Sequence, residues 1–271
     1  MQKKALVVDN DFFFVEFLSD LLAKRGYQVS KAYNGKQGIA ELEDKTVDIL
    51  FSDLILQKVD GRQFFKFIRE KYNGNHFPMV ALSGSMIEQL GSLAEIGADY
   101  YIAKGPIDKL TVKLNEFLEG LETRSLFPAS EQKVLAAGNV YPRRDAMELM
   151  NSLYFHQAVI DCAAVGIIIL DDDTRIINVN PTALDIIGKR SVGVLNRPIA
   201  DLFAAQERVE LIDGLKQVKR QNDTKKVSFY ATFHSRLSET TISAIKMQDN
   251  FVGWVVVLTP AHLNDPKALT V

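Results

Sequence analysis

Along the first 120 residues, short apolar runs alternate with segments in which apolar residues recur at helical spacing. Residues 5–8 form the first run, and the helical pattern that follows ends at Gly26. The pair of patterns recurs four more times, with strands expected over residues 27–32, 48–52, 79–82 and 100–103. Five strands, each followed by a helix, predict a parallel sheet covered by helices on both faces.

Between residues 122 and 144 the periodicity weakens, and proline and glycine interrupt it, so we interpret this stretch as a linker. Apolar residues then recur at alternating spacings of three and four from Ala146 to Ala163. This pattern is typical of a helical seam between chains, and equally of an amphipathic helix that packs on its own domain. His156 lies on the same stripe, and we interpret it as a seam or core residue and not as a ligand.

The pattern changes after Ala163. Strands expected over residues 166–170 and 175–179 flank an acidic turn, which indicates a hairpin. Asn180 before Pro181 predicts the start of a short helix that ends at Gly188. A longer helix is expected over residues 201–219, and strands over 226–233, 240–247 and 251–258. This order predicts an α+β domain with a five-stranded antiparallel sheet and helices on one side.

Composition narrows the class of protein. The 271 residues suffice for about two domains of ~150 residues. With 32 basic and 34 acidic residues, the net charge of −2 does not favour nucleic acid or membrane surfaces as partners. The single cysteine, Cys162, fits a reducing compartment, and the longest apolar stretch, 163–170, is far shorter than the ~18 residues of a spanning helix. We therefore expect a cytoplasmic protein.

Polar residues follow several of the predicted parallel strands. Asp9 follows the first, Asp53 the third, Ser83 the fourth and Lys104 the fifth. Ligands of open parallel sheets bind at the carboxyl ends of the strands. Carboxylates that converge there repel each other unless a cation lies between them, and Mg²⁺ prefers oxygen ligands. A hydroxyl and an ammonium beside that cation would suit a phosphoryl group.

Four motifs at these positions carry a resemblance to a known family. They are VVDND, DILFSDLILQKVDG, ALSG and GADYYIAKG, and with them the chain from Lys3 to about Glu119 resembles a response-regulator receiver domain. The resemblance implies a flavodoxin-like α/β fold, a doubly wound parallel sheet with strand order 2-1-3-4-5. It also implies that Asp53 accepts a phosphoryl group from a histidine kinase.

The resemblance further implies a metal site. Asp9, Asp53 and the backbone carbonyl of Ile55 would hold Mg²⁺. The family's second acidic ligand is replaced here by Asn10, whose amide oxygen can ligate without charge. We therefore expect weaker Mg²⁺ binding than in the family.

The resemblance also implies how phosphorylation is read. Ser83 would donate to a phosphoryl oxygen, Lys104 would pair with the phosphate, and Tyr101 matches the aromatic residue that moves inward. The segment Lys104-Gly105-Pro106 and Gln57 depart from the family pattern. These departures, with Asn10, leave open that phosphoryl transfer is impaired and that the domain is a constitutive docking surface.

The second half of the chain resembles a PAS domain, through ILDDDTRIINVNPTALDIIG, VLNRPIADLF and FVGWVVVL. Such domains bind haem, flavin, small acids or nothing. Cys162 precedes the first strand, unlike the cysteine of flavin-adduct domains, and neither His156 nor His234 lies in a haem-ligand context. The PAS ligand is unknown, and an empty or small-ligand core is the simpler interpretation.

The resulting division is a receiver domain over residues 1–121, a linker with an amphipathic helix over 122–154, a PAS domain over 155–260 and a tail over 261–271. We expect a two-component response regulator with no enzymatic activity, phosphorylated on Asp53. Because no output module follows Pro260 in this sequence, we expect output through a homodimer formed by the PAS domain and linker helix, or through partner docking, without DNA binding.

Two alternatives remain. The first is an interaction protein in which a receiver-like domain that is never phosphorylated joins a ligand-sensing PAS module, and Asn10 favours it. The second is a phosphatase, because residues 6–11 also resemble the first motif of haloacid-dehalogenase-like phosphatases. Asp9 would then be the nucleophile, and Asp53 would have no role.

Overall fold

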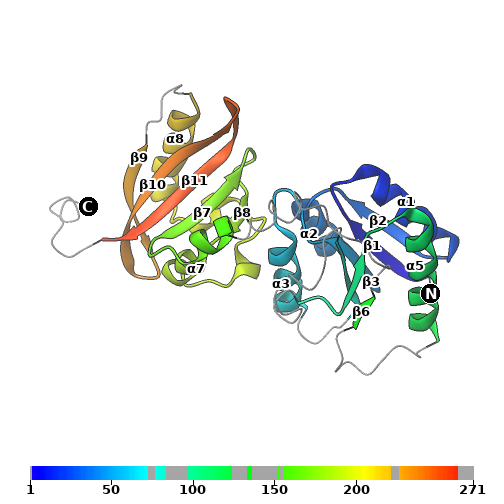
Figure 1. Cartoon of the computed structure of the whole chain (residues 1–271). Coiled ribbons are helices and arrows are strands. Elements are labelled where there is room, and N and C mark those ends of the chain that lie inside the picture. The colour runs from blue at the N-terminus through cyan, green and yellow to red at the C-terminus, as the bar shows by residue number, and fades with distance from the viewer. Residues whose placement is uncertain are drawn as a thin grey trace. The chain divides into compact units, whose positions relative to one another are not determined.

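The computed structural model of the chain describes residues 2–72, 77–83, 97–123, 133–135, 152, 155–220 and 226–261. The chain divides into two compact units, Met1–Asn151 and Ser152–Val271 (Figure 1). The helix expected between the fourth and fifth strands, the first part of the amphipathic helix expected over 146–163, and the tail after residue 261 lie outside the described residues.

The first unit is built on a parallel sheet with the order β2-β1-β3-β4-β5-β6 (Figure 1). Its strands are β1 (Lys4–Val8), β2 (Gln28–Ala32), β3 (Ile49–Asp53), β4 (Met79–Ser83), β5 (Tyr100–Ala103) and β6 (Lys133–Leu135). The predicted doubly wound sheet with strand order 2-1-3-4-5 is confirmed. The structure corrects the sequence interpretation at one edge, because β6 comes from the stretch interpreted as linker and pairs with β5.

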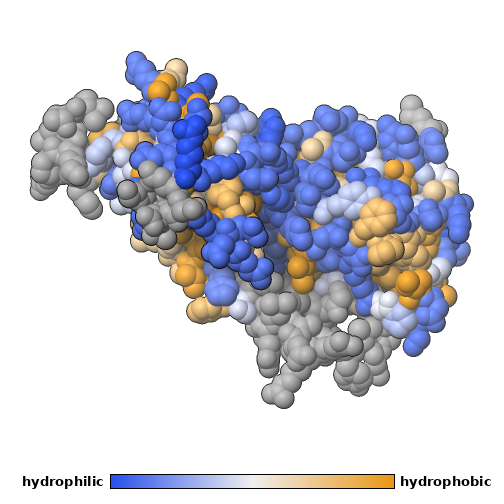
Figure 2. Space-filling model, turned by 90° about the horizontal axis from the view of Figure 1, so that it is seen from above, coloured by the Kyte–Doolittle hydropathy of each residue, from blue (hydrophilic) through white to orange (hydrophobic). Residues whose placement is uncertain are grey.

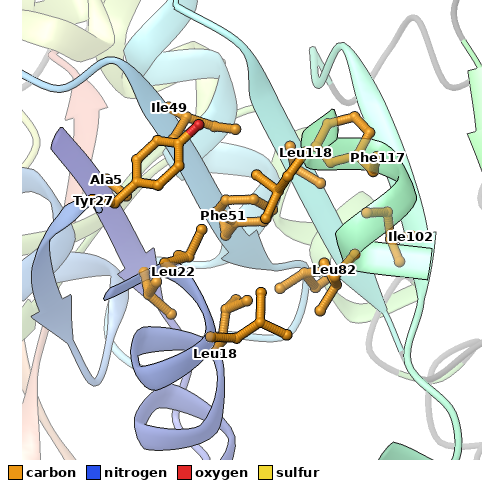
Figure 3. Close-up of a cluster of buried hydrophobic side chains, with 14 of the residues drawn as sticks. Ala5, Leu18, Leu22, Tyr27, Ile49, Phe51, Leu82, Ile102, Phe117 and Leu118 are labelled. Atoms are coloured by element: carbon orange, nitrogen blue, oxygen red, sulfur yellow. The ribbon is translucent and has the colours of Figure 1, made fainter. Parts of the chain in front are cut away.

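Helices cover both faces of this sheet (Figure 1). They are α1 (Phe12–Lys24), α2 (Gly35–Asp44), α3 (Gly61–Lys71) and α5 (Ile107–Glu122). On the face of α1 and α5, Leu18 and Leu22 meet Phe51 of the sheet and Phe117 and Leu118 of α5 (Figure 3). α2 and α3 lie on the opposite face. Burial of these aliphatic and aromatic side chains, at about 25 cal/mol per Å² of apolar surface, is the main stabilisation of the unit.

Two glycines hold the loop after β3 against the neighbouring helices. A Cβ on Gly35 would lie 2.1 Å from the carbonyl oxygen of Val59, and one on Gly61 would lie 2.5 Å from that of Leu54. The N–H of Gly35 also donates to the carbonyl of Gln57 at 3.2 Å. The chain after Asp53 is therefore fixed by close backbone contacts that only glycine permits.

The second unit is built on an antiparallel sheet with the order β8-β7-β11-β10-β9 (Figure 1). Its strands are β7 (Gly166–Asp171), β8 (Ile176–Val179), β9 (Val227–Phe233), β10 (Arg236–Met247) and β11 (Asn250–Pro260). The helical elements are α7 (Pro181–Ile187), η2 (Ser191–Gly193), η3 (Ile199–Leu202) and α8 (Glu207–Arg220). The predicted five-stranded α+β domain is confirmed.

The start of α7 depends on the buried side chain of Asn180. Its Oδ1 accepts from the N–H groups of Ala183, at 2.9 Å, and Ile167, at 2.8 Å. Its Nδ2 donates to the carbonyls of Ile160 and Val165. One side chain therefore caps the helix and ties it to β7 and to the segment before β7, and the predicted N-cap is confirmed.

The helix expected over residues 201–219 begins later than predicted. The structure ends η3 at Leu202 and starts α8 at Glu207. Glu207 Oε2 accepts from the N–H of Ala204, and Oε1 accepts from the N–H of Thr232 on β9. The first bond is half of a capping box, so the turn before Glu207 is an N-terminus and not a helix interior.

Trp254 joins α8 to the sheet of the second unit. Its side chain is buried on β11, and the indole N–H donates to the carbonyl of Leu215 on α8 at 3.1 Å. His156, by contrast, is exposed, so the prediction of a core residue is wrong, and its place in a seam between chains stays a prediction. Phe155 and Val159 of the same helical segment are exposed by 67% and 50%.

The visible surface of the described residues is mostly hydrophilic, with small apolar patches between the polar areas (Figure 2). Within the described part of the chain, no helix is both long and apolar enough to cross a bilayer.

Candidate functional site

The register of β1 and β3 brings two acidic residues to the same edge of the parallel sheet. Val8 pairs with Ser52, so Asp9 and Asp53 follow directly on paired positions of adjacent strands. Both strands are buried and point the same way, which makes this edge the carboxyl end where ligands of such sheets bind. The predicted convergence of two carboxylates therefore follows from the backbone alone.

The next two strands bring a hydroxyl and an ammonium to the same edge. Asp53 pairs with Leu82, and Ser83 pairs with Ala103. The backbone N–H of Lys104 then donates to the carbonyl of Ser83 at 2.7 Å. The four residues predicted from the strand ends thus lie at the carboxyl ends of β1, β3, β4 and β5.

Lys104 occupies the centre of the site. Its Nζ donates to Asp9 Oδ2 at 2.6 Å and to Asp53 Oδ2 at 2.5 Å. The side chains of Asp9, Asp53 and Lys104 are exposed by only 2%, 13% and 19%. Because two buried carboxylates without a counter-charge would be strongly unfavourable, the shared ammonium is what allows them to lie together.

The remaining carboxylate oxygens are oriented by backbone donors. Asp9 Oδ1 accepts from the N–H of Asp11 at 3.0 Å, and Asp53 Oδ1 accepts from the N–H of Ile55 at 3.1 Å. Each carboxylate therefore has one oxygen on the backbone and one on Lys104. Such fixed orientation is what a site for phosphoryl chemistry requires, because positioning and charge neutralisation dominate its catalysis.

The proton affinities of the site reflect burial and mutual charge. Burial raises the pKa of Asp9, the charge of Asp53 raises it further, and Lys104 acts in the opposite direction. Burial disfavours the charged ammonium of Lys104, but the charges of Asp53 and Asp9 outweigh this effect and raise its pKa. Lys104 is therefore a permanent cation at neutral pH.

The donors at this edge fit Mg²⁺ in chemical type. Asp9 and Asp53 offer carboxylate oxygens, Ile55 has a backbone carbonyl, and Asn10 offers an amide oxygen at an exposed position beside Asp9. All are hard oxygen ligands, which Mg²⁺ prefers. The ammonium of Lys104 lies on both carboxylates, so an incoming cation has to share or displace it.

A second acidic group lies in the hairpin between β7 and β8. Among the described residues, the carboxylates of Asp171, Asp172 and Asp173 lie close enough to one another to be compared with a metal site. Asp171 Oδ1, however, accepts from the N–H groups of Asp173 and Arg175 at 3.1 and 2.9 Å. These bonds give the buried Asp171 a structural role in the turn.

The two residues predicted to read phosphorylation are both buried. Ser83 is 1% exposed and Tyr101 is 0% exposed. Burial raises the pKa of Tyr101 to about 12, although a hydrogen bond from the backbone of Ala98 acts in the opposite direction. Tyr101 therefore has its ring buried inside the domain.

The segment Lys104-Gly105-Pro106, which departs from the family pattern, joins β5 directly to α5. No peptide bond among the described residues is cis, so Gly105 and Pro106 are joined in trans. Pro106 occupies the N-cap position of α5.

The sequence did not single out Phe14, which the structure places in contact with the site. The centroid of its ring lies 4.5 Å from Lys104 Nζ. From its spacing in the sequence, Phe14 is expected only on the apolar stripe of α1. An aromatic residue in the first turn of the helix that follows the acidic loop was the available signal.

Comparisons with known proteins agree with this architecture. The family model of the response regulator receiver domain matches residues 5–115, and a PAS domain model matches residues 154–222. The chain is 33% identical over 99 residues to the uncharacterized transcriptional regulatory protein YcbL of Bacillus subtilis, covering 36% of this chain and 43% of that protein. It is 30% identical over 149 residues to the transcriptional regulatory protein CpxR of Klebsiella pneumoniae, covering 54% of this chain and 60% of that protein.

The chain thus spans about half the length of these curated relatives. A similar solved structure is that of the response regulator TrrA of Thermotoga maritima in complex with Mg(2+)-BeF, with 24% identity, a TM-score of 0.37, and coverage of 42% of this chain and 97% of that one. The chain therefore carries a response regulator receiver domain followed by a PAS domain.

Proposed function

We propose that the protein is a phosphorylation-dependent response regulator in which Asp53 accepts a phosphoryl group from a histidine kinase. The observation that carries the proposal is the convergence of Asp9 and Asp53 on the ammonium of Lys104. Asp9, Asp53, the carbonyl of Ile55 and the amide of Asn10 would hold Mg²⁺, which when bound neutralises charge on the transferred group.

The chemistry follows from the side chains at the site. A lone pair of an Asp53 carboxylate oxygen attacks phosphorus, and the P–N bond of a phosphohistidine breaks. The imidazole leaves, and the product is a mixed anhydride on Asp53. Lys104 neutralises negative charge beside the reacting group, and the hydroxyl of Ser83 donates to a phosphoryl oxygen.

Phosphorylation adds roughly −1.5 to −2 charge at the edge of the sheet. The new anion attracts Lys104 and Ser83, and the rearrangement reaches the buried ring of Tyr101 on β5. Output then passes through a homodimer formed by the PAS domain and the linker helix, or through docking of a partner, without DNA binding. The exposed apolar residues Phe155 and Val159 before β7 support a protein partner on that helix. The proposal includes a cytoplasmic location, where histidine kinases phosphorylate their partners.

Intact-mass measurement after incubation with acetyl phosphate and Mg²⁺ tests the proposed phosphoacceptor. We expect one added phosphoryl group on the wild type and none on Asp53→Ala. Asp172→Ala, which removes an exposed acid of the second unit, is the matched control and should be modified like the wild type. An unmodified wild type would favour the interaction protein that is never phosphorylated.

A second measurement separates the phosphatase alternative. Steady turnover of a generic phosphatase substrate that is lost in Asp9→Ala and retained in Asp53→Ala would establish Asp9 as the nucleophile and overturn the proposal. Light scattering with and without Mg²⁺ and beryllofluoride tests the output. We expect the dimer fraction to change, and a constant mass would direct attention to partner docking.

A further inference from the structure

Lys104 has a third partner besides the two carboxylates. Its Nζ lies 4.5 Å from the centroid of the Phe14 ring, well within the ~6 Å over which a cation is attracted to an aromatic face. Phe14 is half-buried, and its ring is 6.1 Å from that of Phe17 on the next turn of α1. The ammonium therefore lies between an aromatic face and two acidic oxygens.

The position of Phe14 is linked to the site through the backbone. Asp11 Oδ1 accepts from the N–H groups of Phe13 and Phe14 at 3.0 and 3.3 Å, which caps α1. The N–H of Asp11 in turn donates to Asp9 Oδ1. The carboxylate that binds Lys104 thus also fixes the turn that carries the aromatic ring.

We propose that Phe14 is a positioning residue that holds the Lys104 ammonium between Asp9 and Asp53, and so weakens the binding of a divalent cation to these carboxylates. The inference rests on the proposed role of Asp9 and Asp53 as cation ligands. It goes beyond that role by assigning control of the metal affinity to an aromatic residue that is not itself a ligand.

The physical basis is competition for the same oxygens. Lys104 occupies Asp9 Oδ2 and Asp53 Oδ2, and an incoming cation needs lone pairs of the same carboxylates. Any interaction that favours the ammonium in this position is lost if the cation displaces it. The attraction to the Phe14 ring is such an interaction, and its removal makes displacement easier.

Isothermal titration of the full chain with MgCl₂ tests the inference without phosphorylation. Phe14→Leu removes the aromatic face and keeps an apolar side chain, and Phe14→Tyr keeps the face. We expect Phe14→Leu to bind Mg²⁺ about three- to tenfold more tightly than the wild type. Phe14→Tyr should bind like the wild type.

The decisive comparison repeats the substitution without the ammonium. Lys104→Met should itself bind Mg²⁺ more tightly, and adding Phe14→Leu should change the affinity no further, because the ring then has no cation to hold. Urea unfolding checks that the variants fold. If Lys104→Met does not fold, Lys104→Gln is used in its place. If Phe14→Leu does not fold, Phe14→Met is used in its place.

Equal tightening by Phe14→Leu with and without Lys104 would overturn the inference, as would unchanged or weaker binding in the presence of Lys104. The mass measurement on Asp53 tests the proposed function separately. If the protein is phosphorylated but substitution of Phe14 leaves its Mg²⁺ affinity unchanged, only the positioning role is refuted. A chain in which even Lys104→Met binds no Mg²⁺ refutes both the positioning role and the metal set.

Discussion

The backbone N–H of Lys104 donates to the carbonyl oxygen of Ser83 at 2.7 Å. This bond extends the ladder between β4 and β5 one step beyond the pair formed by Ser83 and Ala103. The residues that carry the hydroxyl and the ammonium of the site are therefore joined by a backbone hydrogen bond. A rearrangement of the ammonium toward a phosphoryl group is then a movement of the side chain, with its backbone held in place.

Lys104→Met should destabilise the receiver domain by about 3 kcal/mol at neutral pH, because it leaves two buried carboxylates facing each other. The control, Lys45→Met, removes an exposed lysine that follows the last residue of α2 and pairs with Glu41 of that helix, and should cost under about 0.5 kcal/mol. Urea unfolding at neutral pH measures both.

The deficit of Lys104→Met should shrink in acid. Burial already raises the pKa of Asp9, and loss of the ammonium raises it further. At a pH between the pKa of Asp9 in the unfolded state and its higher pKa in the folded variant, the folded state holds a proton that the unfolded state has released. The stability of Lys104→Met therefore falls as pH rises between these two pKa values and recovers as pH falls. A deficit that stays constant down to about pH 4 would contradict the assigned charge interaction.

Tyr101→Phe should change the alkaline stability of the protein. Burial raises the pKa of Tyr101 from 10.0 to about 12. Between these values the unfolded state has lost a proton that the folded state keeps, so the wild type loses up to about 3 kcal/mol as pH rises. Tyr101→Phe has no phenol to titrate, so its free energy of unfolding should not show this decrease. Parallel unfolding curves from pH 9 to about pH 11 measure the difference, and identical slopes would show that the phenol is accessible to solvent.

Gly35→Ala should destabilise the receiver domain by about 2 kcal/mol or more, because its Cβ would lie 2.1 Å from a backbone oxygen of Val59. The loop after Asp53 has to move to make room, so phosphorylation by acetyl phosphate should slow as well. Gly193→Ala, where no atom lies within 4 Å of the added Cβ, is the control and should cost less than about 1 kcal/mol. A fully stable Gly35→Ala would mean that the loop adapts freely.

Asn180→Ala should destabilise the PAS domain by about 3 kcal/mol, because it leaves the N–H groups of Ala183 and Ile167 and two carbonyls without the partners they have now. Asn178→Ala removes one bond to Gln157 and an Oδ1 that is buried without a partner, so it should cost less than about 1 kcal/mol. Thermal unfolding of both variants checks the contrast. Equal decreases in Tm for the two variants would mean that the hydrogen bonds of Asn180 stabilise the domain no more than that of Asn178.

Much of the candidate site could be predicted from local signals. Buried parallel strands are near-continuous apolar runs, and the residues that follow them lie at one edge, so Asp9, Asp53 and Lys104 could be brought together before any coordinates. The cap at Asn180 could be predicted in the same way, because Asn before Pro is a local signature of a helix start.

Contacts between distant segments could not be predicted in this way. The strand Lys133–Leu135 is short, and only its pairing with β5 makes it a strand. The start of α8 depends on Glu207, which bonds both Ala204 and Thr232, the second of them 25 residues away. The ring of Phe14 fits the apolar stripe of its own helix, and its contact with Lys104, 90 residues further along the chain, depends on tertiary packing.

The fluorescence of the Trp254 indole reports on the second domain of the molecule. It is the sole tryptophan of the sequence, and it is buried where α8 meets β11. Selective tryptophan excitation therefore follows the melting of the PAS domain alone, while circular dichroism records both domains. In one sample of the intact chain, the two signals resolve whether the domains unfold together or in sequence.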